Sequence, residues 1–89
     1  MEAVITVVGK DMVGILAKVS GACSNANVNV EEVTQSILRD TFAMIMLVDI
    51  ASCNMPFKKF KAELATLGET MNVDVNITRQ ELFDAMHRI

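Results

Sequence analysis

Two apolar runs constrain the fold of this 89-residue chain more than any other feature of its sequence. Residues 3–8 (AVITVV) and 41–50 (TFAMIMLVDI) are apolar at nearly every position and too short to be typical helices. Such runs favour buried β-strands. A strand that is apolar on both faces has to be covered on both faces. We therefore expect both runs to be central strands of a sheet.

The segments around these runs alternate between helical and strand patterns. Residues 14–26 and 57–71 carry apolar side chains at three- and four-residue spacing, which is typical of amphipathic helices. The patterns of residues 28–38 and 73–78 predict strands with one solvent-exposed face. A short amphipathic helix is expected over residues 80–89.

The strand over residues 28–38 changes phase partway along. Val28 and Val30 share one face, whereas Val33 and Ile37 are out of phase with them. Because side chains alternate strictly across a strand, this slip predicts a bulge or strong local twist near residues 31–32.

The resulting order, β-α-β-β-α-β, predicts a ferredoxin-like α+β sandwich. An antiparallel sheet in the order 4-1-3-2 places the two apolar runs in its centre and two helices on one face. We expect one domain, with residues 1–79 as the core and 80–89 as a C-terminal helix. The second face of the sheet is also apolar, so either the C-terminal helix or a second copy of the chain has to cover it.

The connection between the first strand and the first helix is the strongest candidate for a binding site. Gly9 and Gly14 let the backbone turn sharply and let a ligand approach closely. The helix that follows presents free N–H groups and the positive end of its dipole, which suit a carboxylate. Asp11 could accept a hydrogen bond from an amino group, so the loop offers partners for both charged groups of an α-amino acid. In the alternative, the glycines only make the turn and Asp11 only caps the helix.

Residues 8–19 (VGKDMVGILAKV), followed by residues 27–30 (NVNV), resemble the ACT domain family. In that family a loop of the form xxDxxGILAxV leads into a helix, and the next strand opens with Asn before an apolar residue. The resemblance covers nearly the whole chain, and residues 83–86 are similar to the small stand-alone ACT proteins of bacteria and archaea. Many family members have proline where this chain has Val13, a departure that bears on the shape of the loop.

This resemblance implies a regulatory module that pairs with another copy and binds a small ligand, often an amino acid, at the interface between the two domains. The positions that it implies for ligand contact are Gly9, Lys10, Asp11, Met12, Val13, Gly14, Ile15 and Asn29.

Composition and charge argue against several other functions. The net charge is −3, the only basic cluster is residues 58–61, and no Trp or Tyr is available to stack on bases, so nucleic-acid binding is not expected. No apolar run has the roughly 20 residues that a membrane helix needs. Cys23 and Cys53 make no CxxC motif, and we expect them to be small buried hydrophobes in a reducing cytoplasm, with a redox pair as the alternative.

No catalytic or metal-binding set can be assembled from the sequence. His87 is the only histidine and has no Cys, Asp or Glu at metal-ligand spacing. Glu31 and Glu32 are adjacent in a strand and point to opposite faces, and the serines lack a base. We therefore expect no enzyme, cofactor or metal site.

The leading hypothesis is a homodimeric, or larger, amino-acid sensor, which could also bind an unidentified effector protein. The alternative is a dimerisation module without a small-molecule ligand.

Overall fold

The computed structural model describes residues 1–10 and 14–86 of the chain. In chain order the elements are β1 (Glu2–Gly9), α1 (Ile15–Asn25), β2 (Asn29–Leu38), β3 (Thr41–Asp49), α2 (Phe57–Met71), β4 (Asp74–Arg79) and α3 (Gln80–Met86). This is the predicted β-α-β-β-α-β order, and the bounds of the six core elements agree with the prediction within one residue. The ferredoxin-like fold class is thereby confirmed.

The four strands form one antiparallel sheet in the order β2-β3-β1-β4, which is the predicted order read from the other edge. β1 pairs with β3 from Glu2 opposite Asp49 to Gly9 opposite Phe42, and its other side pairs with β4. The two apolar runs are therefore the two central strands, as their patterns predict.

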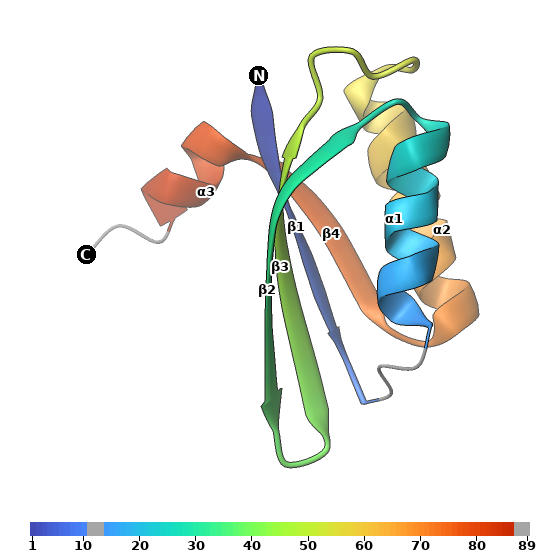
Figure 1. Ribbon diagram of the computed structural model, residues 1–89, viewed down its shortest axis with the longest axis vertical. Coiled ribbons are helices and arrows are strands. Elements are labelled where there is room, and N and C mark those ends of the chain that lie inside the picture. Colours follow the sequence, from blue (N-terminus) through green and yellow to red (C-terminus); the bar gives the residue numbers. More distant parts are fainter. Residues whose placement is uncertain (11–13, 87–89) are drawn as a thin grey trace.

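Helices α1 and α2 cover one face of the sheet, and α3 lies on the opposite face (Figure 1). The core fills the space between the sheet and the first two helices, and none of the described residues buries a polar or charged side chain. Its largest fully buried side chains are Phe60, Ile5, Ile15, Met44, Met46, Leu64, Ile77, Val7, Val19, Val48 and Cys23. Burial of apolar surface in this layer contributes about 25 cal/mol of free energy per Å² and is the main contribution that holds the helices on the sheet.

The bulge expected in β2 is present. Val30 pairs with Val48 and Glu32 with Leu47, so Glu31 is the extra residue. After the bulge, Val33 and Ile37 pair with Met46 and Phe42 and hence lie on the helix side of the sheet. Both are exposed, Ile37 by 57%, even though their cross-strand partners are buried.

The face opposite α1 and α2 is only partly covered. The short helix α3 contacts β1 and β4, and Val4, which points to this face, is buried. Val8 and Ile45, on the same face of the two central strands, remain 46% and 45% exposed. Leu82 of α3, which the sequence pattern places on an apolar stripe, is 56% exposed and not buried against the sheet.

Candidate functional site

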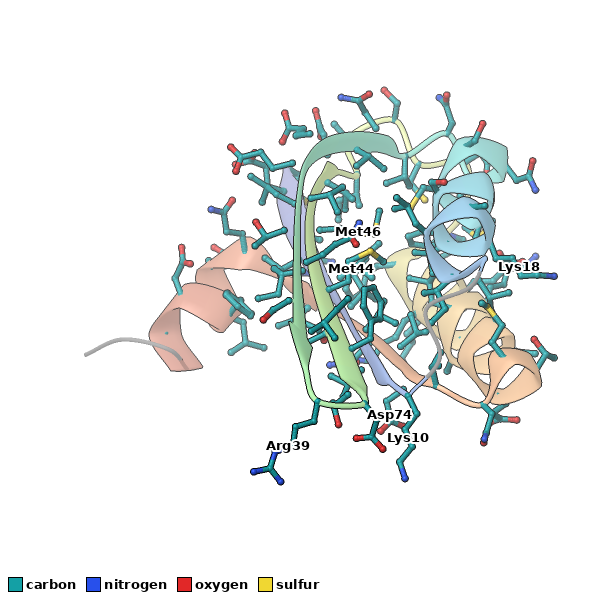
Figure 2. All side chains as sticks on the ribbon, turned by 60° about the horizontal axis from the view of Figure 1, so that its bottom comes forward. Lys10, Lys18, Arg39, Met44, Met46 and Asp74 are labelled. Atoms are coloured by element: carbon teal, nitrogen blue, oxygen red, sulfur yellow. The ribbon has the colours of Figure 1, made fainter. Side chains whose placement is uncertain are left out.

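The predicted binding loop connects the end of β1 to the start of α1. Gly9 is the last residue of β1 and Ile15 the first of α1. Lys10 is exposed, and its side chain extends beyond the end of the sheet (Figure 2). Ile15 is buried in the core, so only its backbone can contact a ligand. Asp11, Met12 and Val13 lie outside the described residues.

The backbone conformation explains why glycine occupies position 14. It precedes α1 at φ 76° and ψ −3°, in the left-handed region, where a side chain is strained. A Cβ on this residue would meet nothing within 4 Å, so packing does not require glycine here.

The N-terminus of α1 has the features of an anion receptor. The Lys18 N–H donates to the Gly14 carbonyl over 3.0 Å and begins the helical hydrogen-bond pattern. The N–H groups of residues 15–17 precede this pattern and have no acceptor within the helix. No acidic residue lies in the first turn of α1 to offset the positive end of the dipole. This geometry suits a carboxylate, as the sequence of the loop predicts.

Gly9 is glycine for a different reason. A Cβ at this position would lie 2.3 Å from Cγ1 and 2.9 Å from Cβ of Val73. Val73 therefore occupies the space that a side chain, or a ligand on that side of the backbone, would need. Close packing against Val73 is thus a structural reason for glycine at this position, separate from the turn and from ligand binding.

Asn29 lies far from Gly14 within one chain. It is exposed at the start of β2, where it pairs with Asp49, and α1 separates it from Gly14. With 11 residues, α1 is about 16 Å long at 1.5 Å per residue. Figure 1 shows that α1 begins at the end of the molecule where β2 finishes and ends where β2 starts. The predicted contacts thus lie at opposite ends of one protomer.

Of the predicted contacts, Asn29 lines one hollow and Gly9 and Lys10 line another, whereas Gly14 and Ile15 line neither. Asn29 lines a hollow of about 520 Å³ together with residues that are not among the predicted contacts: Ser20, Ser24, Asn27, Val28, Val30, Asp49 and Ser52. Ser20 and Ser24 are four residues apart in α1, and this spacing is the one local signal that places them on a common face. The rest come together only through the tertiary fold.

The second hollow, of about 800 Å³, contains Gly9 and Lys10 and lies where the turn between α2 and β4 meets the end of β1. Lys10 supplies a positive charge to it, and Glu69 and Asp74 supply negative charges. Figure 2 shows Lys10 and Asp74 close together at this end of the sheet. Because Lys10 lies about 60 residues from Glu69 and Asp74 in the sequence, the sequence alone does not indicate that they line one hollow.

Beside β2 lies a strip of exposed apolar residues, Leu16, Val33 and Ile37. Leu16 belongs to the apolar spacing of residues 14–26, which is typical of a buried helix face, but it is exposed. It shares a helix face with Ser20 and Ser24, which border the start of β2. β2 itself is a ten-residue edge strand, and an edge strand presents unpaired backbone N–H and C=O groups. Edge and strip together form a surface suited to pairing.

Carboxyl groups gather where β1 and β2 begin. A hydrogen bond with Glu2, together with the negative charges of Glu2 and Asp49, raises the pKa of the Glu31 carboxyl. The pKa of Asp49 is lowered because its Oδ1 accepts the Ala51 N–H over 2.9 Å. This end of the sheet therefore gathers several carboxyl groups, and the N-terminal ammonium of Met1 lies 3.5 Å from Oδ1 of Asp49.

No helix in the described part of the chain combines the length and the apolarity that a bilayer-spanning segment requires. Within residues 1–10 and 14–86, no three His, Cys, Asp or Glu side chains form a group that could hold a metal ion. His87 lies outside these ranges.

The fold and the site together define a small ferredoxin-like module that presents a helix N-terminus and an open sheet edge. Residues 2–78 match the family model of the ACT domain. A UPF0237 protein of Listeria monocytogenes is 45% identical over 89 residues, which is 100% of each chain. A UPF0237 protein of Methanopyrus kandleri is 41% identical over 88 residues, 99% of this chain and 98% of the relative.

A solved structure shows the same likeness. The ACT domain protein from Streptococcus pneumoniae has a TM-score of 0.82 at 37% identity and covers 98% of each chain. The chain therefore belongs to the ACT domain family, whose members are regulatory modules that bind small ligands.

Proposed function

We propose that this protein is a homodimeric amino-acid sensor, a regulatory module rather than an enzyme. In this proposal the ligand lies between the N-terminus of α1 in one protomer and Asn29 of the other. One observation carries it: the receptor-like helix N-terminus and Asn29 lie at opposite ends of one chain, and α1, which lies between them, contacts β2, an open edge of the sheet.

Pairing of two β2 edges around a two-fold axis would bring these ends together. In an antiparallel pair, the start of one β2 lies beside the end of the other. Since α1 begins at the end of the molecule where β2 finishes, the start of the partner's β2 approaches the loop. The same contact removes Leu16, Val33 and Ile37 from water and satisfies the backbone groups of the edge.

The groups on the two sides of the proposed site, the N-terminus of α1 and Asn29 of the other protomer, suit a zwitterionic amino acid. The N–H groups of residues 15–17, which have no acceptor within the helix, would hold the carboxylate. The ammonium group would be held by Asp11 in the loop and by the amide oxygen of Asn29 from the other protomer. An amino-acid side chain could then occupy the hollow that Asn29 shares with Ser20 and Ser24.

A thermal-shift screen of the 20 amino acids tests the proposal. At about a hundred times its dissociation constant, a bound ligand adds roughly 2.7 kcal/mol to the free energy of unfolding and raises Tm. Asn29→Ala is expected to abolish the shift and leave the dimer intact. Asn76→Ala is the matched control, because Asn76 is an exposed asparagine on β4 and is absent from both hollows.

A panel in which no amino acid raises Tm would count against the sensor and favour the alternative function, a dimerisation module without a ligand. The apolar strip beside β2 supports pairing in both cases. A shift that survives both Asn29→Ala and Gly14→Val would place the ligand elsewhere on the molecule.

A further inference from the structure

A third hollow opens at the end of the molecule where β1 begins and β4 finishes, between the sheet and the start of α2 (Figure 1). Its volume is about 180 Å³, which is smaller than that of either of the other two hollows. Its lining comes from the start of the chain, the connection between β3 and α2, α2 itself and the end of β4, and it includes Met1, Cys53, Met55, Phe57, Phe60 and Arg79. The proposed sensor site uses none of these residues.

The side chains around this hollow are apolar with one exception. Phe60 is fully buried and closes the hollow toward the core, whereas Met1 is 70% exposed and lies on its open side. None of the lining side chains is a carboxylate, an amide or a hydroxyl, and Arg79 supplies the only cation. The remaining apolar side chains are partly buried and pack against the core: Ile50, Cys53, Met55 and Phe57.

The strand pattern directs Arg79 toward this hollow. Val75 and Ile77 of β4 are buried on the helix side of the sheet, and Arg79 follows in the same phase. Its guanidinium lies over the ring of Phe57, with Cζ 4.7 Å from the ring centroid, and Nη1 donates to Sδ of Met1 over 3.1 Å. The ring and the thioether thus hold the cation in place.

The guanidinium of Arg79 is partly buried and has no carboxylate partner in the part of the chain that the structure describes. A thioether sulfur is a weak acceptor, so the contact with Met1 satisfies the N–H donors only poorly. Arginine binds a carboxylate through two parallel N–H···O bonds, and such charge-assisted bonds are about twice as strong as neutral ones. A carboxylate in this hollow would therefore give Arg79 the acceptor that a guanidinium prefers.

The size and the lining of the hollow restrict what it can bind. A water takes about 30 Å³ in the liquid, so the hollow has room for about six waters or for an organic acid of about four to six carbons. The apolar lining suits an aliphatic chain. An ammonium group would find no oxygen acceptor on any lining side chain, and a buried charge without a partner is costly. The hollow therefore fits a short aliphatic acid better than an α-amino acid.

We propose that this hollow is a second ligand site, in which Arg79 binds the carboxylate of a short aliphatic acid and the lining around Phe57 and Phe60 holds its chain. The site lies within one protomer, so it rests neither on the pairing of β2 edges nor on the amino-acid sensor. Arg79 selects for an acid group, and a lining without side-chain oxygens selects against an ammonium group.

NMR of the methionine methyl groups tests the proposal on the full chain, because Met1 and Met55 line the hollow, whereas Met44 and Met46 are buried in the core and do not. The probe is isocaproate, which is the skeleton of leucine without its amino group, titrated at millimolar concentrations. Its matched controls are the corresponding primary alcohol, which lacks the charge, and leucine, which adds the ammonium group. We expect isocaproate alone to shift the signals of Met1 and Met55, and none of the three compounds to shift those of Met44 and Met46.

Three variants test the role of the cation. Arg79→Gln removes it from the hollow, and Arg39→Gln removes an arginine from the exposed turn between β2 and β3, at the opposite end of the sheet (Figure 2). We expect Arg79→Gln to weaken the binding of isocaproate by at least about tenfold, Arg79→Lys to retain part of it and Arg39→Gln to leave it unchanged. Circular dichroism checks the fold of each variant.

Every other result would overturn the site. Equal shifts with the alcohol would show that Arg79 does not recognise the acid, and equal shifts with leucine would contradict the selectivity against an ammonium group. A wild type without shifts at Met1 and Met55, or undiminished binding to a folded Arg79→Gln, would overturn the carboxylate site itself. The comparison of acid and alcohol uses only the wild type, so it decides the proposal even where Arg79→Gln does not fold. None of these outcomes bears on the sensor, which is tested through Asn29.

Discussion

Gly9 and Gly21 show that the same residue type can have opposite roles. A Cβ on Gly9 would collide with Val73, whereas a Cβ on Gly21 would meet nothing within 4 Å. Gly21 lies inside α1, where glycine lowers helix stability because it leaves the unfolded backbone more freedom. The structure therefore assigns packing to Gly9 and no packing role to Gly21.

The two glycines are expected to respond in opposite directions to alanine. Gly9→Ala should lower the free energy of unfolding by about 1–3 kcal/mol, because the added methyl overpacks against Val73. Gly21→Ala should raise it by about 0.5–1 kcal/mol through helix propensity. Urea denaturation of both variants measures this, and a loss of stability in Gly21→Ala would contradict the assignment.

At the scale of the element, two helices end on asparagines in the left-handed region. Asn72 follows α2 at φ 59°, and Asn27 follows α1 at φ 60°. After α2, the N–H groups of Asn72 and Val73 donate to the carbonyls of Glu69 and Gly68, which satisfies the last turn. Asn27 also donates from its side chain to the Ser52 carbonyl over 3.0 Å. Thus Asn72 acts through its backbone, and Asn27 in addition joins two loops.

Substitution by glycine should distinguish the two caps. Asn72→Gly should be neutral or slightly stabilising, while Asn72→Ala should cost about 1 kcal/mol, because alanine is strained at positive φ. Asn27→Gly should cost about 0.5–1.5 kcal/mol through the lost hydrogen bond to Ser52. Thermal unfolding measures all three, and equal losses for both glycine variants would argue against the difference.

At the scale of the whole molecule, stability depends on one apolar core, and Cys23 is a titratable group inside it. Burial raises the pKa of the Cys23 thiol to about 11, with a smaller contribution from nearby Cys53. An exposed thiol in the unfolded chain ionises near its ordinary pKa of 9.0. Between these two values the unfolded chain releases a proton that the folded chain retains, so ionisation favours unfolding.

The contribution of the buried thiol should be present in full below pH 9.0 and should be lost as the pH rises toward about 11. Cys23→Ala removes the titrating group and should flatten this part of the stability curve. The free energy of unfolding, measured by urea denaturation at several alkaline pH values, gives the two curves. Equal alkaline slopes for the wild type and Cys23→Ala would rule out this role for Cys23.

The residues that determine the fold act through patterns that are local in the sequence. Apolar runs on both faces identify the central strands, three- and four-residue spacing identifies the helices, and a phase slip locates the bulge at Glu31. Each pattern reflects burial on a known period, so the order of elements and the order of strands followed from the sequence alone.

Only the tertiary structure decided how distant residues meet. It placed Val73 against Gly9, left Leu16 and Leu82 exposed, and set Asn29 at the far end of α1 from Gly14. None of these follows from a periodic pattern, because each depends on where two separate elements pack in three dimensions. The sequence by itself thus determined the fold and the helix N-terminus as a candidate receptor. The resemblance to a known family already implied a second copy of the chain at the ligand site. Only the packed molecule shows that the start of α1 and the start of β2 lie at opposite ends of one protomer, since packing alone sets which ends of the elements lie together.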